Sequence, residues 1–111
     1  MPAIYDVYGF GADDLGGEPD GLAEVLGVVW EAHDSDYVGP HFVASGQPFG
    51  GGRLVLQPND LHDSSGGYLQ LPDFPLARFL LFVNKCPDAD GVRARLTARP
   101  QWRFLQRRVL D

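Results

Sequence analysis

The stretch Phe79-Leu80-Leu81-Phe82-Val83 places five apolar residues in a row. A strand with one solvent-exposed face alternates apolar and polar residues. An unbroken apolar run is therefore typical of a strand that is covered on both faces. The run is much shorter than the roughly 18 residues that a membrane-spanning helix needs. The sequence therefore predicts that residues 79–83 form the central strand of a folded domain.

The flanking sequence predicts two helices. Residues 19–26 carry apolar residues at helical spacing and are followed by Gly27, a common helix terminator. Residues 89–99 follow Asp88, a good N-cap residue, and precede Pro100, which blocks further extension. We expect these two segments to be amphipathic helices that cover a sheet.

Five further short segments, rich in apolar residues and bounded by turn residues, predict strands. They are residues 3–8, 28–33, 41–44, 53–57 and 102–110. We expect Trp30 to lie with the 79–83 strand at the centre of the core. Residues 58–75 exceed the roughly 12 to 15 residues of a usual structureless connection, so we expect this loop to be functional or partly ordered.

The elements follow the order β-α-β-β-β-β-α-β. This order predicts an α+β domain, a two-layer sandwich in which two helices cover a mixed or antiparallel sheet with a ferredoxin-like character. The 111 residues suffice for a single globular domain, residues 1–111, with no need for a metal or disulfide staple. A lone cysteine, Cys86, excludes an internal disulfide.

The composition narrows the class of partner. Fifteen Asp and Glu against nine Lys and Arg give a net charge of −6, which argues against a general nucleic-acid binder. Residues 1–6 lack the basic start and long apolar stretch of a signal peptide. We therefore expect a soluble cytoplasmic protein with no membrane partner, no direct nucleic-acid contact and no cofactor.

The charge is distributed unevenly along the chain. Residues 1–52 contain nine acidic residues and no Lys or Arg, whereas residues 53–111 contain all nine basic residues and six acidic ones. Such asymmetry suggests an interaction surface. The alternative is that the two halves neutralise each other across the fold.

Three patterns resemble catalytic or cofactor motifs but lack the required context. Gly9-Phe10-Gly11 is half of a dinucleotide fingerprint, yet Asp14 stands where the third glycine belongs, so a turn is expected. Cys86 is expected to be a small buried residue, and Ser64-Ser65 lacks a nucleophile-elbow sequence. We predict no catalytic residue.

A cluster of His and Asp residues supports one enzymatic alternative. His33, Asp34, Asp36 and His41 supply ligand types that suit zinc or another divalent ion. The spacing matches no strong metal motif, and acidic turns usually bond to their own backbone. The alternative is a small metal-dependent enzyme that uses these four side chains.

Several segments taken together resemble a family of small acidic bacterial proteins. They are Val25-Leu26-Gly27-Val28, residues 30–39, Leu56-Gln57-Pro58-Asn59-Asp60, Phe74-Pro75 and Leu80-Leu81-Phe82-Val83-Asn84. The set resembles immunity proteins of polymorphic-toxin and contact-dependent inhibition systems. The resemblance implies a cytoplasmic, non-catalytic protein that binds and blocks a cognate toxin, for example a basic nuclease domain.

An acidic docking surface fits this interpretation, because opposite charge speeds association with a basic partner. We expect the contact to involve acidic side chains of two loops and one tyrosine: Asp13, Asp14, Glu18, Asp34, Asp36 and Tyr37. A third alternative is a ligand-sensing or oligomerising domain whose sheet edge pairs with a second copy to form a homodimer.

Overall fold

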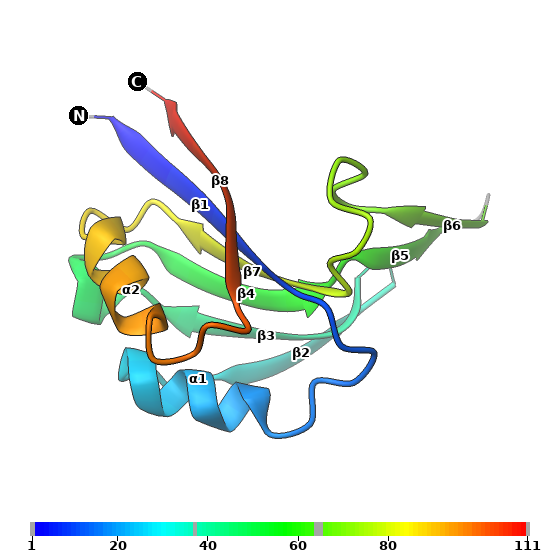
Figure 1. Ribbon diagram of the computed structural model, residues 1–111, viewed down its shortest axis with the longest axis horizontal. Coiled ribbons are helices and arrows are strands. Elements are labelled where there is room, and N and C mark those ends of the chain that lie inside the picture. Colours follow the sequence, from blue (N-terminus) through cyan, green and yellow to red (C-terminus); the bar gives the residue numbers. More distant parts are fainter. Residues whose placement is uncertain (1, 37, 64–65, 111) are drawn as a thin grey trace.

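Six strands form one antiparallel sheet in the order β2-β3-β4-β7-β1-β8 (Figure 1). The computed structural model describes residues 2–36, 38–63 and 66–110. The strands of the sheet are β1 (Ala3–Phe10), β2 (Glu31–Ser35), β3 (Gly39–Ser45), β4 (Arg53–Pro58), β7 (Phe79–Asn84) and β8 (Arg103–Leu110). The predicted α+β class and the predicted order of helices and sheet strands are confirmed.

Two helices cover one face of this sheet, α1 (Glu18–Leu26) and α2 (Ala89–Leu96) (Figure 1). Helix α1 ends at Gly27, which adopts a left-handed conformation with φ 68°. Helix α2 begins after Asp88, whose carboxylate accepts a hydrogen bond of 3.0 Å from the Gly91 N–H. Both predicted end signals are therefore confirmed.

Helix α2 is shorter than the predicted 89–99 segment. From Thr97 to Arg99, each backbone N–H donates to the carbonyl oxygen three residues earlier, so the α-helical pattern stops at Leu96. The Thr97 hydroxyl also donates to the Ala94 carbonyl oxygen at 2.7 Å. A hydroxyl that bonds to the preceding turn competes with continued helix, which the sequence pattern did not reveal.

Strand β7 lies in the interior of the sheet, between β4 and β1. Its Leu81 and Val83 side chains are fully buried in the core under the helices. Leu80 points to the opposite face, where it packs with Val7 and Ala77 in a second, smaller cluster. The prediction of a central strand covered on both faces is confirmed.

The predicted strand at residues 28–33 is wrong in position, and so is the central role of Trp30. The strand begins only at Glu31, and Val29 is 87% exposed. Trp30 is partly buried at the margin of the core, where its indole N–H donates to the Pro19 carbonyl oxygen at 2.8 Å. Trp30 stands directly before this edge strand and packs only at the margin of the core, whereas Val28, two residues earlier, is buried within it.

The long loop after β4 is partly ordered, which is one of the two alternatives expected for residues 58–75. It forms a separate hairpin of β5 (Asp60–Asp63) and β6 (Gly66–Leu69), which projects from the main sheet (Figure 1). The described helices include none long and apolar enough to span a membrane.

Candidate functional site: an acidic sheet edge

The two edge strands of the sheet carry opposite charge. Strand β2 lies at one edge and bears Glu31 and Asp34, whereas β8 lies at the other edge and bears Arg103 and Arg108. All four of these side chains belong to exposed residues. The charge asymmetry of the sequence thus becomes an asymmetry between opposite sides of the fold.

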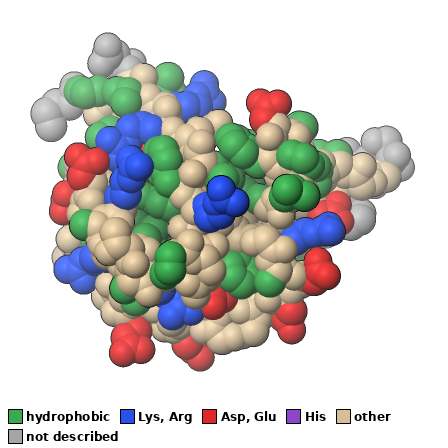
Figure 2. Space-filling model, viewed as in Figure 1, with side chains coloured by type: hydrophobic (Ala, Val, Ile, Leu, Met, Phe, Trp, Pro, Cys, Tyr) green, Lys and Arg blue, Asp and Glu red, His purple; other side chains and the backbone are tan. Residues whose placement is uncertain are grey.

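Helix α1 extends the acidic side beyond β2. The hydrogen bond between Trp30 and Pro19 ties the segment before β2 to the first turn of α1. We call the exposed acidic residues of these two elements and of the turn after β2 the acidic edge; they are Asp20, Glu24, Glu31, Asp34 and Asp36. Figure 2 shows acidic side chains along the margin where α1 lies and basic side chains over β8.

Strand β2 presents an open backbone edge together with this charge. Within the described residues it pairs only with β3, so its other side has no neighbouring strand. All five of its residues are exposed. Residues 11–52 contain no Lys or Arg, so no basic side chain from this part of the sequence neutralises the acidic edge.

The loop before α1 contains two of the predicted contact residues, one in an ion pair with a distant residue and one in a local hydrogen bond. Asp13 forms an ion pair of 3.3 Å with Arg78, and both side chains are largely exposed. The Asp14 carboxylate accepts a hydrogen bond of 3.0 Å from the Gly16 N–H. The ion pair of Asp13 is exposed and contributes little stability, so a partner can displace it. Both carboxylates are therefore accessible to a partner.

Glu18 differs from the other predicted contact residues because it points into the protein. Its carboxylate accepts hydrogen bonds from Arg99 at 2.7 and 3.2 Å and from the Trp102 indole at 2.7 Å. Burial alone would raise its pKa, but hydrogen bonds from Arg99, Trp102 and Gln101 outweigh burial and lower it. Glu18 therefore fastens α1 to the segment before β8, and its side chain is only 14% exposed.

A second inward-facing carboxylate was not singled out in the sequence. Asp6 on β1 is fully buried, and both of its oxygens accept hydrogen bonds from Arg107, at 2.8 and 2.9 Å. Arg107 also donates to Asp90 at 2.8 Å, and bonding to Asp6 and Asp90 raises the pKa of its guanidinium. Asp6, Asp13 and Glu18 from the N-terminal half of the sequence thus form ion pairs with arginines from the C-terminal half. The residues of the acidic edge take no part in these three ion pairs.

The structure does not assemble the four side chains of the metal hypothesis. His33 lies opposite His41 with stacked rings 5.6 Å apart, whereas Asp34 lies opposite Pro40. Because successive side chains of a strand point to opposite faces, Asp34 and His33 diverge. In the described ranges, no group of three or more His, Cys, Asp or Glu side chains is placed to hold a metal ion.

Each of the two imidazoles has one nitrogen atom close to a neighbouring polar group. The His33 Nε2 atom lies 3.3 Å from a Glu31 carboxylate oxygen. The His41 Nδ1 atom lies 2.9 Å from the Gly39 carbonyl oxygen, so Nδ1 carries the proton that is shared with it. The remaining predicted contact residue, Tyr37, and the Ser64-Ser65 pair lie outside the described residues.

Cys86 is fully buried, as predicted for a small core residue. Burial raises the pKa of its thiol, which disfavours the reactive thiolate.

No protein-family model, curated protein or solved structure matches the chain. The acidic edge is accordingly the feature on which a functional proposal rests.

Proposed function

We propose that this chain is a non-catalytic cytoplasmic binding protein of the immunity type, which neutralises a cognate toxin by docking its acidic edge onto it. One observation carries the proposal: β2, an edge strand that is exposed along its whole length and has no strand on its outer side among the described residues, bears Glu31 and Asp34 of the acidic edge. Strand edges offer backbone hydrogen bonds to a partner, and the charge selects which partner approaches.

The chemistry of the acidic edge favours a basic partner. A toxin that cleaves nucleic acid carries a basic cleft, and an acidic surface placed over that cleft blocks it without any chemical step. Asp34 lies near the end of β2 and Asp36 directly follows the strand, and both residues are exposed. These two residues are therefore expected to contribute most to the association rate.

The proposal is tested by co-expression with the toxin domain encoded by the adjacent reading frame. We expect the wild-type chain to restore growth of the bacterial host and to co-elute with the toxin domain at a fixed ratio. Reversing the charge of the acidic edge by Asp34→Lys and Asp36→Lys should abolish both effects.

A matched control distinguishes an effect of the acidic edge from an effect of net charge alone. Asp60→Lys with Asp73→Lys changes the net charge equally, but both positions lie in or after the β5–β6 hairpin. Protection that survives the Asp34 and Asp36 reversal, or that is lost equally in the control, contradicts docking through the acidic edge. A non-toxic neighbour that forms no complex contradicts the immunity function itself.

A further inference from the structure

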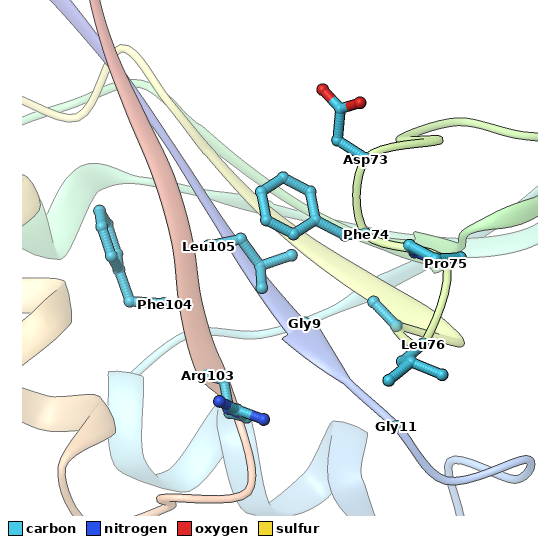
Figure 3. Close-up of a pocket in the computed structure, with 10 residues that line it drawn as sticks. Gly9, Gly11, Asp73, Phe74, Pro75, Leu76, Arg103, Phe104 and Leu105 are labelled. Carbon is cyan, nitrogen blue, oxygen red and sulfur yellow. The ribbon is translucent and has the colours of Figure 1, made fainter.

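A groove of about 460 Å³ lies on the face of the sheet that the helices leave open. Gly9 of β1 and Gly11 just after the strand form its floor, β8 forms one wall, and the turn at residues 73–77 forms the other (Figure 3). It belongs to a different face and a different sheet edge from the acidic edge. The proposed toxin contact therefore does not use it.

The walls of the groove are apolar. Leu105 projects from β8, while Phe74 and Leu76 project from the opposite turn (Figure 3). Leu76 is 85% exposed, which leaves most of a large apolar side chain in contact with water. An occupant with an apolar body would remove this surface from water, which is the main source of binding free energy in such sites.

The floor of the groove depends on a glycine. A Cβ atom at Gly9 would lie 2.9 Å from the Leu105 Cδ1 atom and 3.0 Å from the Ala77 Cβ atom, so a larger residue there would displace the end of the Leu105 side chain and crowd Ala77. Glycine at this position lets the two walls approach the bare backbone of β1. The narrow apolar groove is therefore a built feature of the sheet face rather than a gap between loops.

A single buried side chain fixes the turn that forms the second wall. The Asn59 amide donates to the carbonyl oxygens of Phe74 and Ala77 at 3.1 and 2.8 Å, and its oxygen accepts from the Leu71 N–H at 2.8 Å. Asn59 is fully buried, and its side-chain amide both donates and accepts hydrogen bonds. The wall is thus held in place before any ligand arrives, which lowers the entropic cost of binding.

Arg103 supplies the one positive charge in the lining of the groove (Figure 3). Within the described part of the chain it forms no ion pair, in contrast to Arg99 and Arg107, which bind internal carboxylates. The Asp73 carboxylate at the rim points away from the other lining side chains (Figure 3). A guanidinium binds a carboxylate with two parallel hydrogen bonds, so Arg103 selects a ligand that carries this group.

We propose that the groove binds a small monocarboxylic acid with an apolar body, the carboxylate on Arg103 and the body between Leu105 and Leu76. The volume lies within the range of about 300 to 1,000 Å³ of small-molecule sites. Apolar walls and one cation together match this class, whereas a sugar or a nucleotide needs many more polar contacts.

The test titrates three probes of equal chain length into the full chain: octanoate, octanamide and octylammonium. Backbone amide resonances of Gly9, Gly11 and residues 73–77 report occupancy of the groove by NMR. We expect saturable shifts at these resonances with octanoate, binding at least about tenfold weaker with octanamide, and none with octylammonium.

Two variants on the same strand separate the specific charge from general charge. Arg103→Gln should weaken octanoate binding by about tenfold and leave octanamide binding unchanged. Arg108→Gln removes another exposed charge from β8, outside the groove lining, and should leave octanoate binding unchanged. Urea unfolding of both variants checks that the fold is intact.

Several results overturn the proposal. Equal affinity for octanoate and octanamide, an equal loss in both arginine variants, or shifts outside the groove would each contradict a carboxylate site at Arg103. If a peptide with a C-terminal leucine bound more tightly than octanoate, the groove would be a site for a protein segment and not for a small carboxylic acid. Octanoate binding that persists in the Asp34→Lys and Asp36→Lys variant is expected, since the two sites are separate.

Discussion

Four of the nine acidic residues of the N-terminal half illustrate two different surroundings. Asp6 and Glu18 point inward and bind arginines from the C-terminal half, whereas Asp34 and Asp36 stand at an open sheet edge. The same residue types close to each other in sequence thus hold the fold together or remain available to a partner. The difference lies in burial and partners, which the sequence pattern does not display.

The largest expected effect comes from the more deeply buried carboxylate. Asp6→Asn removes the negative charge that Arg107 binds with two hydrogen bonds, and we expect a loss of about 3 kcal/mol in the free energy of unfolding. Urea unfolding measures this loss. Asp90→Asn is the matched control, because Asp90 binds the same arginine from an 83% exposed position; a similar loss there would contradict the role of burial.

Glu18→Gln should cost less, about 1 to 2 kcal/mol, because the amide retains a hydrogen-bond acceptor for Trp102. The lowered pKa of Glu18 makes this difference depend on pH. The stabilisation is complete above the ordinary value of 4.5 and is lost as pH falls through the lower pKa of the folded state.

Unfolding curves of wild type and Glu18→Gln between pH 7 and pH 3 follow this dependence. Glu24→Gln on the same helix, an exposed position, should behave as wild type at every pH. A gap between wild type and Glu18→Gln that is constant with pH would show that Glu18 is not charged in its hydrogen-bonded state.

Tyr8 tests an inward polar group that lacks a partner. Its hydroxyl is buried and has no hydrogen-bond partner among the described residues. Tyr8→Phe should therefore leave the free energy of unfolding unchanged or raise it by up to about 1 kcal/mol at neutral pH. A loss above that size would reveal a hydrogen bond at this hydroxyl.

The same tyrosine predicts a change in alkaline solution. Burial, reinforced by the Asp6 charge, raises the pKa of Tyr8 from 10.0 to about 12. The unfolded chain releases this proton at lower pH than the folded one, so wild type should lose stability between pH 10 and pH 12. Tyr8→Phe should lack that part of the loss, as thermal unfolding across this range would show.

The outward carboxylates should have the smallest effect on stability. Asp34→Asn with Asp36→Asn should leave the urea midpoint unchanged, because both positions are exposed. The same double variant should slow association with a basic partner, and the effect should shrink as salt rises, since exposed charges are screened over roughly 8 Å at physiological ionic strength. An unchanged association rate at low salt would contradict steering by the acidic edge.

The sequence predicts those parts of the fold that depend on local pattern. The apolar run of β7, the Asp88 cap and the Gly27 terminator each specify their element through neighbouring residues, and all three appear as expected. The start of β2 was misplaced because Val28, Val29 and Trp30 favour a strand locally, whereas the connection from α1 sets where pairing begins. Local propensity gave way to tertiary geometry there.

The candidate sites depend more on pairing between distant residues. Charge alone predicted that Asp34, Asp36 and Glu18 lie at the surface; the first two are exposed, but Glu18 points inward to Arg99, which lies 81 residues away in the sequence. The groove was missed altogether, although a glycine inside β1 is a sequence signal for close approach. Which side chains converge over Gly9 follows from the topology of the sheet, which the order of elements does not specify.

The position of Asn59 has a consequence for the way the molecule opens. The hairpin and the turn beyond it form an excursion from the main sheet, and the Asn59 amide connects the start of this excursion to its end. Loss of the Asn59 side-chain hydrogen bonds would loosen this segment without breaking the pairing of β4 with β7. We therefore expect backbone amide protons of the described residues between Asp60 and Ala77 to exchange with solvent before those of β7.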